Sequence, residues 1–220
     1  MLPKSKKVLF TALASVSMLF SSSIVAQDKG LISIIVNDMS NPYWQTEGTI
    51  AERTAEELGY DANVSSHVGD TNTESNQVDT AITNGAKAII LDPANADGSI
   101  GAVRRAIDAG IPVFIINAEI NQQGLAKAQL VSNNAQGAAL GAQEWAMQLD
   151  GEGSYIELKG PPSDNNAATR SNGYETVLSQ YPDLTLAASD IANWDRTEGR
   201  NKMQSMLRSH PDIRGVISGN

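Results

Sequence analysis

The chain has 220 residues, of which 41% are hydrophobic and 19% charged, a composition typical of a globular protein with one large domain or two small ones. It contains no cysteine, which excludes disulfide bonds, thiol nucleophiles and Cys-ligated zinc. Its formal net charge of −9 at pH 7 makes nucleic acid and anionic lipid unfavourable partners.

The first 26 residues have the features of a cleavable secretory signal peptide. Lys4, Lys6 and Lys7 form a basic start, the apolar run VLFTALASVSMLF follows, and a Ser-rich stretch ends at the small residue Ala26. The apolar run is too short to span a bilayer comfortably, which argues against a membrane-retained helix. We therefore expect residues 1–26 to be a signal peptide and the mature protein to reside in a bacterial periplasm.

The remaining chain alternates between short β-branched runs and helix-like segments. Strands are expected at 31–36, 62–68, 86–91, 113–117, 128–132, 154–158, 184–189 and 215–218. Helices are expected at 42–58, 73–84, 97–109, 134–149, 165–180 and 195–209. The periodicity of the first helix predicts that its buried face consists of Ile50, Thr54, Ala55 and Leu58.

This alternation predicts the fold class. Strands that are apolar throughout belong to sheets covered on both faces, and repeated strand–helix–strand units form right-handed crossovers within a parallel sheet. We expect an α/β protein with two doubly wound, Rossmann-like lobes, residues 27–132 and 133–220, joined near Ser132 and Asn133. In such folds, ligands bind outside the carboxyl ends of the strands.

The residues that follow the strands are rich in Asn and include two of the three tryptophans. Amide side chains both donate and accept hydrogen bonds, and aromatic rings cover the apolar face of a sugar ring. Together they favour a shared crevice for a neutral, polyhydroxylated ligand. Structural explanations also exist, because Asn41-Pro42 is a good helix start and Tyr43 and Trp44 could pack between helix and sheet.

Enzymatic patterns are absent from the sequence. No G-x-S-x-G, H-E-x-x-H, Walker or G-x-G-x-x-G motif occurs, and the only two histidines, His67 and His210, lie in different predicted lobes. The segment from Asp70 resembles the start of a calcium loop, but Ser75 and Ala81 replace the Gly and the bidentate Glu that such a loop needs. We expect no catalytic set, no metal and no cofactor.

Five segments together resemble the periplasmic sugar-binding proteins of ABC transporters, type I, and most closely their ribose-binding branch. The segments are SNPYW (40–44), LDPAN (91–95), INAEI (116–120), NAATRSNGY (166–174) and NWDRTEGRNKMQSMLRSHPDIRGVISGN (193–220). The resemblance runs from about residue 30 to residue 220. It implies two lobes that close over a small neutral sugar or polyol.

The resemblance assigns roles to individual residues. Asn41 matches a hydroxyl-binding Asn, Tyr43 and Trp44 match paired aromatics, and Arg170 matches an Arg that reaches the sugar from the second lobe. Trp194 replaces a stacking Phe, Asn220 matches a terminal Asn of the site, and Asn37 is a weaker candidate. The resulting candidate ligand-binding set is Asn37, Asn41, Tyr43, Trp44, Asn117, Glu119, Arg170, Trp194 and Asn220.

Two departures from the family pattern matter. Asn117-Ala118 stands where ribose binders have Asp-Arg, so the bidentate clamp on adjacent hydroxyls is lost, and Glu119 or Asn37 is expected to compensate. Another pentose, a hexose or a sugar alcohol is then as good a ligand as ribose. Family members also continue beyond the equivalent of Asn220, so we expect an incomplete second lobe with exposed apolar surface.

The resulting functional hypothesis is a solute-binding component of an ABC importer. The resemblance implies a membrane permease as partner and leaves a chemoreceptor open. The alternatives are a quorum-signal binder of the same family, the effector domain of a DNA-binding regulator and a periplasmic hydrolase. The regulator would need a helix-turn-helix where the signal peptide stands, and the hydrolase would need two carboxylates facing each other across the crevice.

Overall fold

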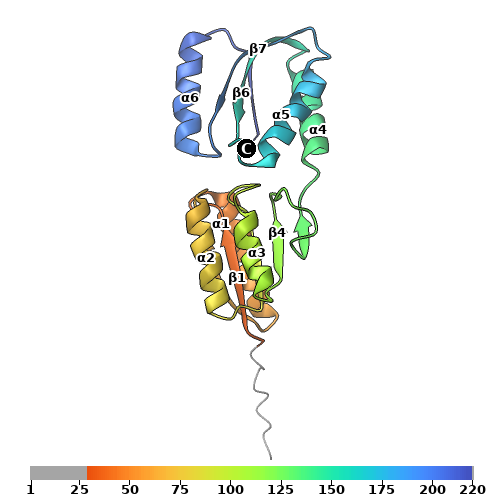
Figure 1. Cartoon of the computed structure of the whole chain (residues 1–220). Helices are drawn as coiled ribbons and strands as arrows, with labels where there is room; N and C mark the ends of the chain where they lie inside the picture. Colours follow the sequence, from red (N-terminus) through yellow and green to blue (C-terminus); the bar gives the residue numbers. More distant parts are fainter. Residues whose placement is uncertain (1–28, 220) are drawn as a thin grey trace, which may run out of the picture.

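Two parallel sheets form the framework of the molecule, one in each of two stacked lobes (Figure 1). The structure is a computed structural model that describes residues 29–219, so the expected signal peptide and Asn220 lie outside the described residues. The first sheet has the strand order β2-β1-β3-β4-β5 and the second β7-β6-β8, with every neighbouring pair parallel. The predicted α/β fold class with parallel sheets is confirmed.

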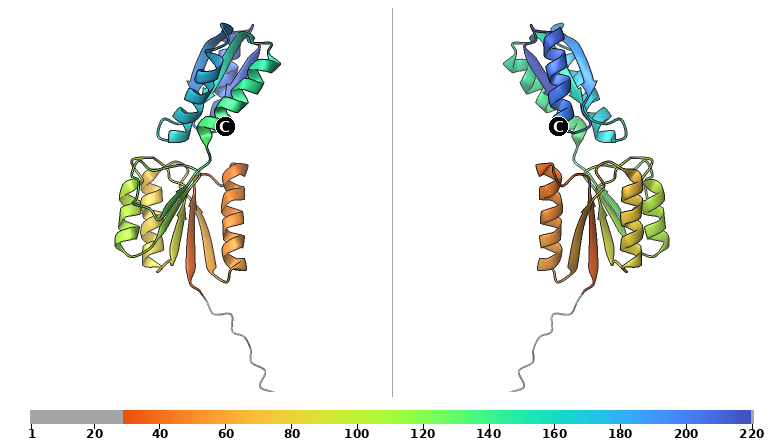
Figure 2. Two further views of the ribbon diagram at one scale, coloured as in Figure 1. Left: turned by 90° about the vertical axis from the view of Figure 1, so that its right-hand side faces the viewer. Right: turned by 90° about the vertical axis from the view of Figure 1, so that its left-hand side faces the viewer.

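The elements follow the predicted alternation. The first lobe contains β1 (Leu31–Val36), α1 (Pro42–Glu57), β2 (Asp61–Ser66), α2 (Thr71–Thr83), β3 (Ala88–Leu91), α3 (Ile100–Asp108), β4 (Val113–Ile116) and β5 (Ala128–Leu130). The second contains α4 (Asn134–Gln148), β6 (Glu152–Lys159), α5 (Asn165–Leu178), β7 (Asp183–Ile191), α6 (Arg196–Ser209) and β8 (Gly215–Ser218). Within residues 29–219 the chain passes between the lobes once, between β5 and α4 (Figure 2).

The element ends differ from the prediction where local hydrogen bonds form turns. The helix expected from residue 97 begins at Ile100, because the Asn95 side chain accepts hydrogen bonds from the backbone of Asp97 and Gly98 and holds a turn there. The strand expected from Ala86 begins two residues later, because the Ala86 N–H donates to Ala81 O at the end of α2.

The predicted buried face of α1 is wrong in part. Ile50 and Leu58 are 42% and 58% exposed and Thr54 is exposed as well, whereas Ala55 is buried as predicted, together with Trp44 and Gly48. A Cβ on Gly48 would lie 2.9 Å from a Val64 methyl, so the helix approaches the sheet most closely at this glycine. That approach turns Ile50 outward, a choice that hydrophobic periodicity alone does not reveal.

Each lobe has its own apolar core, and a third cluster spans the lobes. The first core packs α2 and α3 on the first sheet, and the second packs α4 and α5 on the second sheet.

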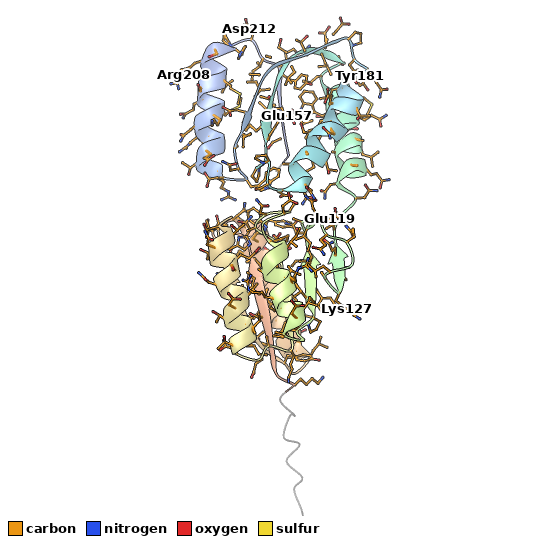
Figure 3. The ribbon with its side chains drawn as sticks, viewed as in Figure 1. Glu119, Lys127, Glu157, Tyr181, Arg208 and Asp212 are labelled. Atoms are coloured by element: carbon orange, nitrogen blue, oxygen red, sulfur yellow. The ribbon has the colours of Figure 1, made fainter. Side chains whose placement is uncertain are left out.

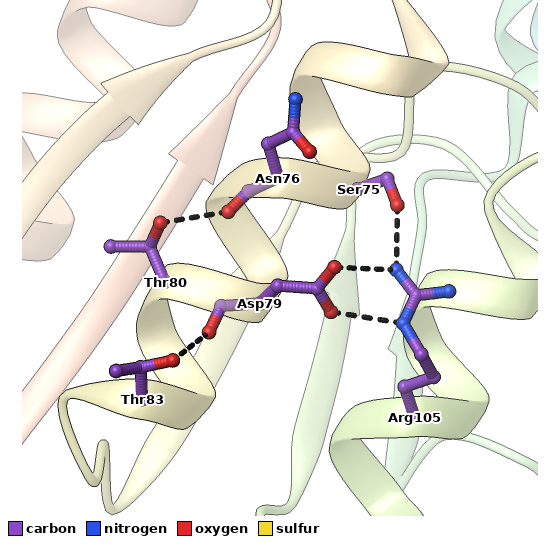
Figure 4. Close-up of polar contacts among 6 residues, drawn as sticks. All are labelled: Ser75, Asn76, Asp79, Thr80, Thr83 and Arg105. Carbon is purple, nitrogen blue, oxygen red and sulfur yellow. Dashed lines mark hydrogen bonds and ion pairs between the residues drawn. The ribbon is translucent and has the colours of Figure 1, made fainter.

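On the surface of the first lobe, Arg105 of α3 joins α2 through Asp79 (2.9 Å) and Ser75 (2.6 Å) (Figure 4). This exposed ion pair contributes about 1 kcal/mol or less to stability.

The third cluster positions the cleft between the lobes. It comprises Ile34, Val36 and Trp44 of the first lobe with Ala167 and Trp194 of the second. The strands of both sheets run toward the other lobe, so their carboxyl ends meet at this level (Figures 1 and 2).

Exposed apolar side chains occur in both lobes, for example Val68 and Leu140, and are not confined to the second. No helix within residues 29–219 is long and apolar enough to cross a membrane.

Candidate ligand-binding site

A cavity of about 410 Å³ lies between the lobes, within the size range of small-molecule sites. The first lobe contributes residues that follow β1, β2 and β3, and the second contributes residues that follow β6 and β7. The lining residues are Asn37, Asp38, Trp44, Val68, Gly69, Pro93, Ala94, Pro161, Ser163, Asp164, Asn193, Trp194, Asp195 and Glu198. The cavity therefore occupies the position that a parallel α/β fold reserves for ligands.

Two tryptophans, one from each lobe, form part of its wall. Trp44 and Trp194 are 6% and 8% exposed and belong to the same apolar cluster. The Trp194 indole N–H donates to Asp164 Oδ2 (2.9 Å), and the Arg170 guanidinium lies 5.6 Å from its ring centroid. Trp44 packs on the sheet and also lines the cavity, so its packing role does not exclude its predicted contact with a ligand.

The turn that carries Trp194 has an uncommon backbone. Asn193 and Trp194 have φ values of 50° and 59°, in the left-handed region that non-glycine residues rarely adopt. Backbone hydrogen bonds from Ala192 to Lys159 and from Asp195 to Ala192 hold the turn at the end of β7. Such conformations persist where surrounding structure enforces them, and they are common at ligand sites.

A chain of hydrogen bonds crosses the first-lobe side of the cleft. Tyr43 Oη donates to Asn117 Oδ1 (3.0 Å), and Asn117 Nδ2 donates to Asp92 Oδ2 (3.0 Å). Asn117 also has a positive φ of 62°, which asparagine tolerates better than most residues. The amide of Asn117 is therefore held in one orientation by partners on both of its polar atoms.

The same chain continues into the second lobe. Asn166 Nδ2 donates to the backbone carbonyl of Asn117 (3.0 Å), and Asn134 Nδ2 donates to Asn166 Oδ1 (2.8 Å). Arg170 then donates through Nε to Asn134 Oδ1 (2.9 Å) and through Nη1 to Gly219 O (2.6 Å). A smaller cavity of about 50 Å³ lies beside this chain, lined by Tyr43, Trp44, Asn117, Asn166, Arg170 and Trp194.

The candidate residues do not all lie at the cleft. Asn37, Tyr43, Trp44, Asn117, Arg170 and Trp194 line one or both cavities. Asn41 lies at the start of α1 as its N-cap and accepts from the backbone N–H of Tyr43 (3.0 Å). Glu119 lies in the loop between β4 and β5 (Figure 3). It lines neither cavity. Asn220 lies outside the described residues.

Several residues of the site were not selected from the sequence. Asp92 and Glu47 lie under the first-lobe wall, and Asp164, Asn134 and Asn166 organise the second-lobe side. One signal was available for Asp92, because an acid between the buried strand residue Leu91 and a proline marks a strand exit. Glu47 gave no such signal, since acidic residues are common on exposed helix faces.

The electrostatics of the first-lobe wall are dominated by Glu47 and Asp92. Burial raises the pKa of Glu47 to about 7, although a hydrogen bond with Asp92 acts in the opposite direction. Burial, with the charge of Glu47 as the second cause, raises the pKa of Asp92 well above its usual range, against the hydrogen bond donated by Asn117. The pair therefore retains protons more strongly than ordinary carboxyls do.

His67 supports the cavity wall in a defined tautomer. The Gly69 N–H donates to Nδ1 (3.0 Å), so Nε2 carries the proton and donates to the Asp92 backbone carbonyl (2.8 Å). Burial lowers the pKa of this imidazole, which favours its neutral form. In the described part of the chain, no three His, Asp or Glu side chains converge in a way that could hold a metal ion.

Two α/β lobes whose strand ends meet around a polar cleft with aromatic walls define a solute-binding protein. The chain belongs to the periplasmic binding protein domain family, whose model matches residues 32–220. The resemblance inferred from its motifs is thereby confirmed, and membership of this family implies a periplasmic location. The expected signal peptide itself lies outside the described residues.

Three similar proteins illustrate the family. The chain is 47% identical over 212 residues to the D-apiose import binding protein of Paraburkholderia graminis, covering 96% of this chain and 68% of that protein. It is 44% identical over 214 residues to the D-apiose import binding protein of Actinobacillus succinogenes, covering 97% and 69%. A periplasmic solute-binding protein of A. succinogenes with bound D-allose superposes with a TM-score of 0.79 at 27% identity, covering 87% and 70%.

Proposed function

We propose that this protein is the substrate-binding component of an ABC sugar importer and that it captures D-apiose or a similarly small neutral sugar in the inter-lobe cleft. The observation that carries the proposal is the 410 Å³ cavity between Trp44 and Trp194, bordered by amide and carboxyl groups from both lobes. The similarity to two D-apiose import binding proteins supports apiose as the first ligand to test.

The chemistry of the cleft fits a small polyhydroxylated molecule. A sugar hydroxyl both donates and accepts a hydrogen bond, and Asn37 and Asn117 carry amides that do the same. Asn117 uses one amide proton for Asp92 and one oxygen lone pair for Tyr43, and the second of each can bond a ligand. The indole faces of Trp44 and Trp194 suit the apolar C–H faces of a sugar ring and exclude water from the polar contacts. We include Asn41 and Asn220 as secondary candidates and retain Glu119 only as an outer residue of the loop after β4.

The environment of Asn117 argues against recognition of ribose by a carboxylate–guanidinium clamp. Ala118 is 4% exposed and offers no side chain to a ligand, and the Asn117 amide is already bonded to Tyr43 and Asp92. The bidentate carboxylate–guanidinium clamp expected of a ribose binder is therefore absent from this strand end. The similarity to two D-apiose import binding proteins is what favours apiose among the other small sugars.

Binding is coupled to the arrangement of the lobes in this proposal. We assign residues 27–132 and 133–220 to the two lobes, with the segment between β5 and α4 as a hinge. Because the cavity is lined from both lobes, ligand contacts are complete only when the lobes are together, so ligand shifts the population toward that state. The closed protein would then dock on a membrane permease, and a chemoreceptor is a further candidate partner.

Isothermal titration calorimetry on the purified chain tests the proposal directly. D-apiose, D-ribose, D-allose and xylitol are titrated separately, with Trp194→Ala as a variant that removes the second-lobe aromatic wall. We expect D-apiose to bind more tightly than D-ribose and the variant to weaken binding by about 1–3 kcal/mol. Absence of binding to every sugar and polyol would contradict the proposed function.

A further inference from the structure

Two acidic side chains from different elements meet beneath the first-lobe wall of the cleft. Asp92 follows β3 and is 1% exposed, and Glu47 projects from α1 into hydrogen-bonding reach of it. The Glu47 Oε2 atom is buried and has no hydrogen-bond donor within residues 29–219. An ionised Asp92 offers only acceptor oxygens to it, so the contact is favourable only when one of the two carboxyls keeps a proton.

Within residues 29–219, no cationic side chain acts on either carboxyl to replace this proton. From the second lobe, the charge of Asp164 acts on Asp92 in the same unfavourable direction as Glu47 does. Burial, and then the charges of Glu47 and Asp92, raise the pKa of the Tyr43 hydroxyl on α1, and the charge of Arg170 opposes them. His67 binds the backbone carbonyl of Asp92 rather than its carboxyl group.

The pair is connected to the cleft through Asn117. Asp92 Oδ2 accepts from Asn117 Nδ2, which leaves Asn117 Oδ1 to accept from the Tyr43 hydroxyl. The backbone carbonyl of the same residue accepts the inter-lobe hydrogen bond from Asn166. A change at Asp92 therefore reaches both the polar face of the site and the contact between the lobes.

We propose that Glu47 is a positioning residue: it shares one proton with Asp92 and thereby fixes the Asn117 side chain for ligand. This inference rests on the proposed function as a sugar-binding protein. When the shared proton is lost, two adjacent carboxylates repel each other, and the displacement of Asp92 moves the Asn117 amide that is bonded to it. Ligand affinity is then highest where the pair is protonated and falls as pH rises.

Linkage between proton binding and ligand binding fixes the direction in which ligand affinity changes with pH. Ligand that brings the lobes together removes water from around the pair and makes ionisation harder still, so binding above the pKa of the pair takes up protons. With one proton involved, affinity falls by at most about tenfold for each unit of pH above that value. A carboxyl with a purely structural role would not produce this pH profile.

The decisive measurement is the Kd of D-apiose by calorimetry between pH 5.5 and 8.5, for the wild type and for Glu47→Gln. Glutamine retains the size of the side chain and donates a hydrogen bond to Asp92 at every pH. We expect the wild-type Kd to rise on the order of tenfold across this range and the variant Kd to stay flat within about twofold. Glu56→Gln, a change at an exposed acid of the same helix, serves as control and should keep the wild-type profile.

A second readout covers the case in which Glu47→Gln does not fold. Titration of the wild type at pH 7.5 in two buffers of different ionisation enthalpy gives the number of protons taken up on binding. Uptake of a fraction of a proton supports the inference, and no uptake overturns it. Binding with a flat wild-type profile, or with the same slope in Glu47→Gln, overturns the inference alone, whereas no binding at any pH contradicts the proposed function as well.

Discussion

The side-chain amide of Asn166 donates a 3.0 Å hydrogen bond to the backbone carbonyl of Asn117, and this bond joins the second lobe to the first at the cleft. Two further contacts accompany it, from the Ala96 N–H to Ser163 O (2.9 Å) and from the Asn165 amide to Asn121 (2.8 Å). The lobes are thus held by direct protein contacts as well as by whatever ligand the cleft receives.

Removing the Asn166 amide should weaken ligand binding. Asn166 is 6% exposed, so Asn166→Ala removes the side-chain donor to the Asn117 carbonyl in a buried place and one of the acceptors of the Asn134 amide. We expect a loss of about 1–3 kcal/mol in binding free energy, measured by calorimetry with D-apiose. Asn165→Ala, which removes the more exposed contact with Asn121, is the control and should cost less than about 1 kcal/mol. Equal effects of the two variants would contradict a special role for Asn166.

A second prediction concerns the close contact between Gly160 and Trp194. A Cβ at residue 160 would overlap the indole ring, so Gly160→Ala must displace the aromatic wall of the cleft. We expect a loss of about 1–3 kcal/mol in the free energy of unfolding, together with weaker ligand binding. Urea denaturation followed by circular dichroism measures the first effect and calorimetry the second.

Gly137 provides the matched control for this substitution. It lies in α4, and a Cβ there would meet no atom within 4 Å. Alanine is the better helix former, so Gly137→Ala should be neutral or stabilising by up to about 1 kcal/mol, with ligand affinity unchanged. If both glycine variants behave alike, the position of Trp194 does not depend on Gly160.

A third prediction uses Glu74, a fully buried acid that supports the cavity wall. Its Oε2 atom accepts from the Ala94 N–H (2.6 Å) and from the Ser99 hydroxyl (2.9 Å), and burial raises its pKa. The folded protein therefore binds more protons than the unfolded chain between the ordinary pKa of Glu, about 4.5, and the raised value. The free energy of unfolding should fall as pH rises through this window.

The variant Glu74→Gln removes the titration of this group. Its absolute stability will drop, because a buried amide lacks a second partner, but the slope of stability against pH should be shallower than in the wild type. Glu47 and Asp92 contribute slopes of the same sign, so part of the pH dependence should remain. Denaturant titrations at pH 5, 6, 7 and 8 measure both slopes. An unchanged slope would show that Glu74 does not titrate in this range.

The fold could be predicted from the sequence because its signals are local and repeated. Runs such as LISIIV and GVIS are apolar on both faces, and both form strands of a parallel sheet over the predicted residues 31–36 and 215–218. The buried face of α1 could not be predicted, because it depends on how closely Gly48 approaches Val64. That distance is set by tertiary packing rather than by the periodicity of the helix.

Local patterns likewise predicted some residues of the candidate site but not the contacts between them. Because the carboxyl ends of parallel strands share an edge, Trp44, Asn117 and Trp194 could be predicted to lie at one cleft, and all three line its cavities. The pairing of Glu47 with Asp92 and of Asn166 with Asn117 joins residues 45 and 49 positions apart. Contacts of this kind depend on the relative placement of helix, sheet and lobe, which no local pattern in the chain encodes.

The charge of the cleft leads to a last prediction, on ligand selectivity. Four acidic side chains, Asp38, Asp164, Asp195 and Glu198, line the larger cavity, and its lining residues include no Lys, Arg or His. Arg170 lines only the smaller cavity. An anionic ligand would therefore meet uncompensated repulsion in a site that partly excludes water.

We expect the aldonic acid of D-apiose to bind at least about tenfold more weakly than the sugar itself at low ionic strength, a difference of about 1.4 kcal/mol. The difference should shrink as salt is added, because mobile ions screen the partly exposed carboxylates. Asp195→Asn tests the cause, since asparagine still caps α6 by accepting from the Glu198 N–H, as Asp195 does at 2.7 Å, while it removes one charge. The variant should bind the acid more tightly and the sugar equally well; an acid that binds the wild type as tightly as the sugar would show that these carboxylates do not select against anions.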